Sequence, residues 1–160
     1  MENVEDILIR EFQSTDRPMV EKFFAEIGEE TAYFFNQGRG NEMLALSFFE
    51  GKCPNHLFWM AEADADGGKE MAGYVFLWDI GTTAPWLGIA VADKWKGRHL
   101  GRRLIAAAKT WCLENGCGAL MLTTAKDNVR GQGLYERCGF EKLGVHANGE
   151  LFYLLRFERK

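Results

Sequence analysis

A strand that runs into a glycine-containing basic turn and then a helix is the feature that most limits how this chain can fold. Residues 86–92 are apolar and predict a strand, and apolar residues recur at helical spacing over residues 100–113. The first turn of a helix has backbone N–H groups without internal partners, and its dipole favours negative charge. The connecting stretch WKGRHLGRRL (residues 95–104) therefore predicts a phosphate site, although a solvated basic helix end fits the same residues.

This turn is a local excess of positive charge in an acidic chain. The formal net charge is -4, yet residues 94–103 hold five of the 19 Lys and Arg residues and no acid. The local excess predicts an anionic ligand, whereas the acidic remainder argues against nucleic acid as a partner. Neither the P-loop pattern GxxxxGK[ST] nor the dinucleotide pattern GxGxxG is present.

Length and composition predict one globular domain over residues 1–160. The chain has 160 residues, of which 47% are apolar, enough to bury a core. No apolar run approaches the roughly 18 residues of a membrane span, and no basic-then-apolar leader opens the chain, so we expect no membrane partner. The four cysteines lack metal-binding spacing, which predicts reduced thiols, no metal site and a cytoplasmic protein.

The remaining patterns alternate between strand and helix. The segment 29–40 is rich in aromatic rings and is expected to be a loop, and Asn41 is expected to cap the helix that follows. The strands are expected at 7–12, 56–63, 71–80, 86–92, 119–124, 140–147 and 151–157. The helices are expected at 14–28, 42–51, 100–113 and 128–138.

Two blocks of sequence resemble the GNAT superfamily of N-acetyltransferases. The stretch GIAVADKWKGRHLGRRLI resembles the family's acetyl-CoA signature, Q/R-x-x-G-x-G/A after a strand, with Lys96 at the Q/R position and Gly101 at the final glycine. The stretch NVRGQGLYERCGF is similar to N-x-x-A-x-x-L-Y-x-x-x-G-F, with Gly131 where alanine is usual. The resemblance is strong over residues 71–145.

The resemblance implies a fold and a cosubstrate. The implied fold is α+β, a mixed and mostly antiparallel sheet of about seven strands with helices on both faces and a splayed cofactor strand. Acetyl-CoA would place its pyrophosphate on the basic turn and its pantetheine arm along the splayed strand. The residues implied to bind it are Ile89, Val91, Lys96, Gly97, Arg98, His99, Leu100, Gly101, Arg102 and Asn128.

His99 departs from the family pattern because it stands where the central glycine is usual. A side chain there costs roughly 1 kcal/mol or more if the backbone φ angle is positive. The ring could lie near a phosphate and carry charge in mild acid, or it could point into solvent.

Acetyl transfer to an amine needs groups that move protons. Tyr135 resembles the family's general acid, although a tyrosine packed between helix and sheet would look the same. The strand before the second block offers Thr123 and Thr124 rather than the Glu of some relatives. Asp79 is the favoured base because it ends the strand beside the cofactor strand; Glu62, Glu29, Glu30 or water are alternatives.

The acceptor is expected to be a small-molecule or peptide amine that attacks acetyl-CoA directly in a ternary complex. In this family the segment after the first helix and the C-terminal hairpin usually shape its pocket. Here the acids Glu29 and Glu30, with the rings of residues 33–35, would suit a cationic amine with an apolar body, unless Phe34 and Phe35 are core residues. The alternative function is a domain of the same fold that senses acyl-CoA without turnover. The resemblance allows a monomer or a homodimer.

Overall fold

The protein is built on one sheet of seven strands in the order β1-β2-β3-β4-β5-β7-β6. Its structure is a computed structural model that describes residues 7–35 and 40–158. The strands are β1 (Leu8–Glu11), β2 (His56–Ala65), β3 (Gly68–Trp78), β4 (Trp86–Val91), β5 (Ala119–Thr124), β6 (Glu141–Val145) and β7 (Leu151–Arg156). The helices are α1 (Arg17–Ala25), α2 (Glu29–Phe35), α3 (Asn41–Ser47), α4 (Leu100–Glu114) and α5 (Val129–Arg137), with short 3-10 helices η2 (Phe48–Glu50) and η3 (Asp93–Trp95).

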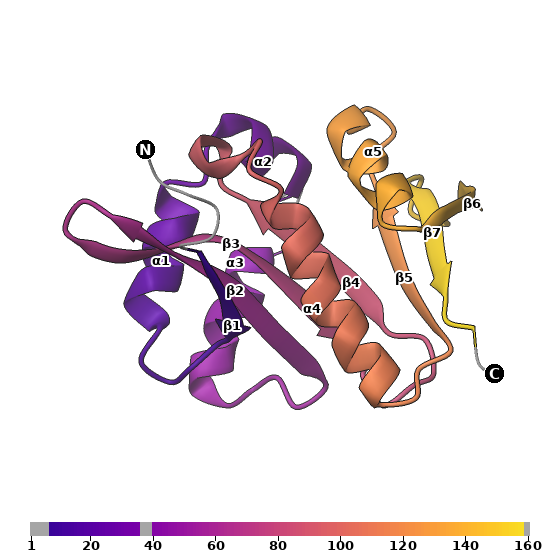
Figure 1. Ribbon diagram of the computed structural model, residues 1–160, viewed down its shortest axis with the longest axis horizontal. Coiled ribbons are helices and arrows are strands. Elements are labelled where there is room, and N and C mark those ends of the chain that lie inside the picture. Colours follow the sequence, from indigo (N-terminus) through magenta and orange to yellow (C-terminus); the bar gives the residue numbers. More distant parts are fainter. Residues whose placement is uncertain (1–6, 36–39, 159–160) are drawn as a thin grey trace.

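Neighbouring strands run antiparallel except β4 and β5, which run parallel and pair at a single position, Trp86 with Met121. Beyond that position the two strands diverge (Figure 1). β3 pairs with the whole of β4, from Trp86 to Val91, so the sheet is continuous on one side of β4 and parted on the other. The predicted mixed sheet with a splayed β4 is therefore confirmed.

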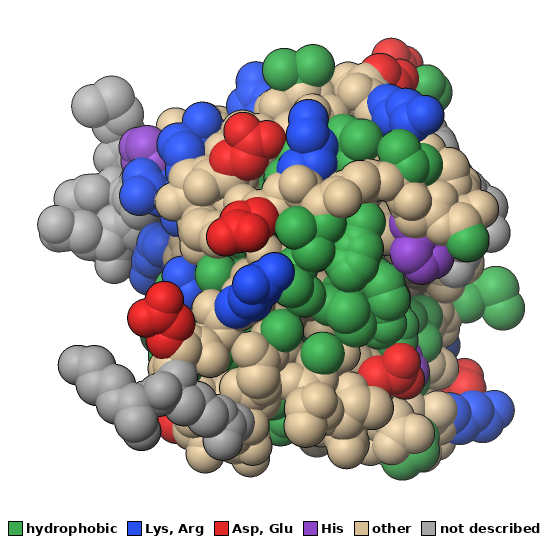
Figure 2. Space-filling view, turned by 90° about the vertical axis from the view of Figure 1, so that its right-hand side faces the viewer, with side chains coloured by type: hydrophobic (Ala, Val, Ile, Leu, Met, Phe, Trp, Pro, Cys, Tyr) green, Lys and Arg blue, Asp and Glu red, His purple; other side chains and the backbone are tan. Residues whose placement is uncertain are grey.

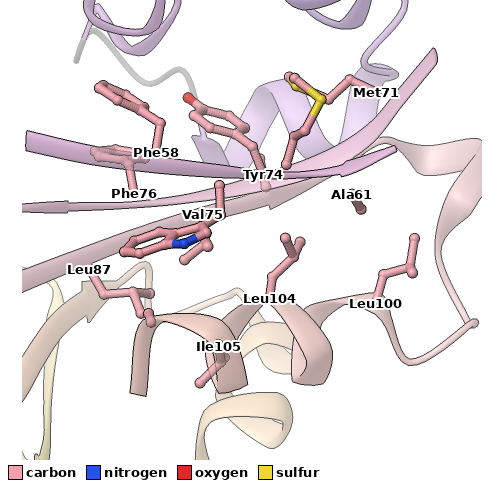
Figure 3. Close-up of a cluster of buried hydrophobic side chains, with 14 of the residues drawn as sticks. Phe58, Ala61, Met71, Tyr74, Val75, Phe76, Leu87, Leu100, Leu104 and Ile105 are labelled. Carbon is pink, nitrogen blue, oxygen red and sulfur yellow. The ribbon is translucent and has the colours of Figure 1, made fainter. Parts of the chain in front are cut away.

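Helices cover both faces of the sheet. Side chains on a strand point alternately to opposite faces, so Tyr74 and Phe76 face α1 and α3 while Val75 faces α4 (Figure 3). Leu104 and Ile105 of α4 are both fully buried, and Leu104 points toward this second face (Figure 3). The expected α+β fold, with helices on both faces, is confirmed.

The far end of the sheet is an edge strand, β6, all of whose side chains are exposed. Figure 2 views the molecule from the side of α5, β6 and β7, where apolar side chains gather in the middle of the face. Leu143 and Val145 of β6 are among the exposed large apolar residues. None of the helices described is long and apolar enough to cross a membrane.

The expectation of a loop over residues 29–40 is wrong for its first part, because Glu29–Phe35 form α2. Residues 36–39 lie outside the described part of the chain. A carboxylate from a distant segment stabilises the start of this helix: Asp93 accepts hydrogen bonds from the N–H groups of Glu30 and Thr31, both at 3.1 Å, and from the Thr31 hydroxyl at 2.6 Å. Gly28 admits this carboxylate, since a Cβ atom there would overlap it.

The expected cap of α3 is also wrong. Asn41 lies inside the helix, and Gly40, with φ 64°, is the capping residue. The Asn41 amide instead donates a hydrogen bond to the Phe35 carbonyl, which joins α3 to the end of α2. The Asn41 side chain, which was expected to cap the helix, thus makes a tertiary contact instead.

An aromatic cluster fills the space between the sheet and α1 to α3. Five phenylalanine rings surround Tyr74 at centroid distances of 5.5 to 6.0 Å. The Tyr74 hydroxyl is buried and has no hydrogen-bond partner among the residues that the structure describes, and burial raises its pKa well above the usual value. A hydroxyl buried in this way costs free energy that an apolar atom would not.

We predict that Tyr74→Phe keeps the free energy of unfolding or raises it by about 1 kcal/mol, because it removes an unpaired buried hydroxyl. Urea unfolding measures the change. The matched control is Tyr153→Phe, which removes a hydroxyl that donates to Glu136 at 2.7 Å and should lower stability by about 1 kcal/mol. A clear loss of stability in Tyr74→Phe would contradict the assignment.

Candidate active site

A cavity of about 770 Å³ lies where β4 and β5 separate. One part is lined by the turn between β4 and α4, by the start of α4, and by α5 with its cap, including Lys96, Arg102 and Asn128. The other part is lined by α2, α3, β3 and the turn between β6 and β7, including Phe35, Trp78 and Glu150. The cavity thus joins the predicted phosphate site to an aromatic chamber.

The open edge of β4 offers backbone groups to this cavity. The Ala92 N–H donates to the carbonyl of Ala72 in β3 at 2.9 Å. Antiparallel ladders alternate, so Val91 and Ile89 turn their N–H and C=O groups away from β3 and toward β5. The strands have parted there, so an extended ligand could bind as an added strand. The register between β3 and β4 is regular, so β4 has no bulge there. The edge of β4 is open because β5 diverges from it.

Both residues predicted on this strand line the cavity, but one of them already has a partner. The Val91 carbonyl accepts a hydrogen bond from the Thr31 hydroxyl at 2.8 Å. α2 therefore competes with any ligand for this carbonyl, and Ile89 is the better placed of the two to bond a ligand.

The start of α4 faces the cavity without a side-chain cap. Several residues predicted to bind the cosubstrate line the cavity: Gly97 and His99 of the turn, and Leu100, Gly101 and Arg102 at the start of the helix. The N–H groups of the first turn are unpaired within the helix and suit an anion. Gly101 has a second role, because a Cβ atom there would press on Leu134 of α5.

His99 has φ 62°, in the left-handed region, and its side chain is exposed. Histidine enters this region more readily than most residues, but a strain of roughly 1 kcal/mol remains compared with glycine. The sequence thus places a strained residue at the position where the backbone needs a glycine-like conformation.

Some cations of residues 94–103 face the cavity, and the others make contacts within the protein. The Arg98 guanidinium stacks on the Trp95 ring at 4.7 Å and does not line the cavity. Arg103 donates to the Ile7 carbonyl at 2.7 Å, and Lys94 pairs with Glu70 at 2.8 Å. Of the five cations in residues 94–103, only Lys96 and Arg102 line the cavity, to which α5 adds Arg130 and Arg137.

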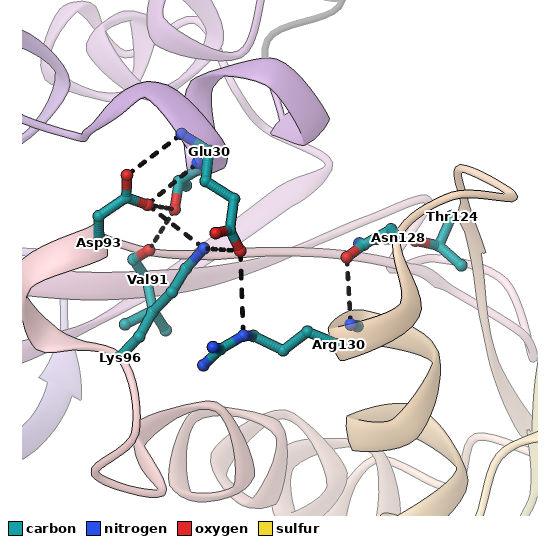
Figure 4. A network of polar contacts seen from close by, with 9 residues as sticks. Glu30, Val91, Asp93, Lys96, Thr124, Asn128 and Arg130 are labelled. Carbon is teal, nitrogen blue, oxygen red and sulfur yellow. Dashed lines mark hydrogen bonds and ion pairs between the residues drawn. The ribbon is translucent and has the colours of Figure 1, made fainter.

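Lys96 is held by acidic residues of its own protein (Figure 4). Its ammonium group lies 2.9 Å from Glu30 and 3.3 Å from Asp93, and the Arg130 guanidinium lies 3.9 Å from the same Glu30 oxygen. Burial would raise the pKa of Asp93, but hydrogen bonds from Thr31, Lys96 and Glu30 outweigh it and lower that pKa. Glu30 thus lies beside Lys96, at the predicted phosphate site.

Asn128 lines the cavity and also caps α5. Its side-chain oxygen accepts from the Gly131 N–H at 3.1 Å, and its amide donates to the Thr124 hydroxyl at 3.0 Å. A Cβ atom at residue 131 would overlap the Asn128 side chain, which explains the glycine there. One turn further along, Tyr135 is buried against the rings of Phe140 and Tyr153 and lines the cavity.

Asp79 does not line the cavity. It is exposed at the end of β3 with φ 57°, and its charge acts on His56, which does line the cavity. Burial lowers the pKa of His56 and outweighs the opposing effect of Asp79. Glu62 pairs with Arg10 at 3.3 Å and is likewise absent from the lining.

Four ionisable residues of the lining were not predicted from the sequence: His56, Arg130, Arg137 and Glu150. His56 pairs across the sheet with Trp78, and Glu150 follows the turn of the C-terminal hairpin. The predicted rings Phe34 and Phe35 do line the cavity, whereas Tyr33 donates to Asp127 at 3.1 Å outside it. Among the described residues, no group of three His, Cys, Asp or Glu side chains could hold a metal ion.

Comparison with known proteins agrees with this geometry. The model of the Acetyltransferase (GNAT) family matches residues 6–140. A Bacillus subtilis (strain 168) protein named for N-acetylation of an alanine of ribosomal protein bS18 is 28% identical over 102 residues, which are 64% of this chain and 66% of that protein. The mycothiol acetyltransferase of Corynebacterium jeikeium (strain K411) is 31% identical over 108 residues, 66% of this chain and 26% of that protein.

Solved structures share the fold. The PaiA N-acetyltransferase of Thermoplasma acidophilum in complex with coenzyme A superposes with a TM-score of 0.75 at 16% identity, over 94% of this chain and 99% of that one. The matched segments span just under two thirds of the Bacillus relative and about a quarter of the Corynebacterium relative. The family model, however, covers most of the present sequence, and on that ground the chain belongs to the GNAT acetyltransferase family.

Proposed function

We propose that this protein is an acetyl-CoA-dependent N-acetyltransferase that transfers the acetyl group to a primary amine. The observation that carries the proposal is the cavity that joins the open edge of β4 to the uncapped start of α4. An extended arm ending in a pyrophosphate needs both features, an edge for its amides and N–H groups for its charge.

The residues of the chain fit this cosubstrate. The first-turn N–H groups of α4 and the Arg102 side chain would bind the pyrophosphate, and the backbone of Ile89 would bond the pantetheine arm. Lys96 would contribute once a phosphate replaces Glu30 as its partner. Arg98 lies outside the lining, so it would support the turn by stacking on Trp95 rather than by contacting the pyrophosphate.

In the proposed reaction, acetyl-CoA supplies the thioester and the amine nitrogen attacks its carbonyl carbon in a ternary complex. The N–H of Ile89 would stabilise the oxyanion, because it points into the opening between β4 and β5. Tyr135 would give a proton to the departing thiolate. The proton that the amine loses would pass to His56, which burial keeps in its neutral form, or to water. Asp79 lies outside the lining, so any part that it takes would pass through His56.

We predict that Tyr135→Phe lowers kcat about 100-fold, the effect of losing a positioned general acid, while the KM for acetyl-CoA stays within about twofold. Thiol release from acetyl-CoA with a panel of amines measures both. The phenylalanine keeps the ring contacts with Phe140 and Tyr153, and Tyr153→Phe is the matched control. Unchanged turnover would refute the acid role.

The same assay tests the alternative function. A sensor domain of this fold would bind acetyl-CoA in a calorimeter yet release no thiol with any amine. Absence of binding at millimolar acetyl-CoA would contradict both functions.

We predict that His99→Gly raises the free energy of unfolding by about 1 kcal/mol, because glycine takes the left-handed conformation without strain. The acetyl-CoA Kd should stay within about threefold, since backbone groups and not the exposed ring would carry the contact. Urea unfolding and calorimetry give the two values. A tenfold weaker Kd would assign the imidazole a direct phosphate contact.

A further inference from the structure

We propose that the start of α2 is a built-in competitor of acetyl-CoA, in which the Glu30 carboxylate holds cations that a cosubstrate phosphate would bind. The inference rests on the proposed function and adds to the same site a contact that weakens cosubstrate binding. It follows from the partners of Glu30, from a second contact made by the next residue, and from the acid that positions both.

Glu30 bridges two cations of the cavity that come from different elements (Figure 4). Its Oε1 atom lies 2.9 Å from the Lys96 ammonium, in the turn before α4, and 3.9 Å from the Arg130 guanidinium of α5. Both cations line the phosphate part of the cavity, whereas Glu30 does not line it. A phosphate that binds these cations must therefore replace the carboxylate as their partner.

The two partners of the closer ion pair differ in exposure. The Lys96 side chain is 19% exposed and faces the cavity, whereas the Glu30 side chain is 52% exposed and can turn into solvent. Ion pairs with an exposed partner are weak, and a pyrophosphate carries more charge and more acceptor oxygens than one carboxylate. The pyrophosphate can therefore displace Glu30, but breaking the ion pair lowers the net affinity for the cosubstrate.

The next residue makes a similar contact on β4. The Thr31 hydroxyl lies 2.8 Å from the Val91 carbonyl and 2.6 Å from Asp93 Oδ1, but it has one proton to donate. When a ligand N–H bonds the Val91 carbonyl, the hydroxyl keeps a partner by donating to Asp93. Residues 30 and 31 thus occupy one group suited to the phosphates and one suited to the extended arm.

Asp93 positions both competing residues. It accepts hydrogen bonds from the N–H groups of Glu30 and Thr31, each at 3.1 Å, and it lies 3.3 Å from the Lys96 ammonium. Because this acid anchors the backbone of α2, displacement requires only the two side chains to change partners. The same contacts can re-form as coenzyme A leaves, which favours release of the product.

The test measures the Kd of coenzyme A for the full chain by calorimetry, so it needs no acceptor amine. Glu30→Gln keeps the size of the side chain and removes its charge, and we expect it to bind coenzyme A about 3- to 10-fold more tightly than the wild type does. The matched control is Glu29→Gln, which removes an equal charge from the exposed acid next to it in α2. The Kd of this control should stay within about twofold of the wild-type value.

A second background separates direct competition from a general gain of positive charge. Lys96→Gln should weaken the binding of coenzyme A, because it removes a cation of the phosphate part of the cavity. Adding Glu30→Gln to Lys96→Gln should change the Kd by less than about twofold, since the closer partner of the carboxylate is then absent.

The outcomes separate this inference from the function on which it rests. An unchanged or weaker Kd in Glu30→Gln would overturn the competitor role, as would an equal gain in Glu29→Gln or in the Lys96→Gln background. Tighter binding by Glu30→Gln without thiol release from acetyl-CoA and any amine would support the competitor and contradict the transferase. If coenzyme A binds neither the wild type nor any variant, both the inference and the proposed function are wrong.

Discussion

The structure depends on a sheet that stops pairing partway along two parallel strands. β4 and β5 share one paired position, and beyond it the backbone of β4 presents donors and acceptors to a cavity. Backbone polar groups away from water need partners, so an edge of this kind is stable only if solvent, a side chain or a ligand reaches it. Thr31 already supplies one such partner, to Val91, and an extended cosubstrate could supply the rest.

The parted strands also separate two chemical environments within one cavity. On one side lie the start of α4 and the cations of α4 and α5, which suit phosphates. On the other lie stacked aromatic rings and the carboxylate of Glu150. Both environments border the same stretch of β4. A thioester bound there would therefore have the proposed general acid, Tyr135 of α5, on one side and the acceptor amine on the other.

Local patterns predicted β4, α4, β5 and α5 closely, since apolar periodicity and turn residues determine each of them over a short stretch. The pattern also predicted an anion site at this turn, but not which of its cations face the cavity, because Arg98 and Arg103 are used by contacts with Trp95 and Ile7. α2 was not predictable in this way, since its cap is Asp93, more than 60 positions away. His56 and Glu150 were missed because only the sheet register brings them to the cavity.

Asp93 also ties two distant positions of the chain together. Its carboxylate occupies the space that a side chain at residue 28 would need, and it holds both the start of α2 and Lys96. A larger residue at position 28 would expel the acid, and a smaller residue at position 93 would leave α2 without its cap. Positions 28 and 93 should therefore covary among natural variants of this protein, with glycine at one and an acid at the other, although 64 residues lie between them.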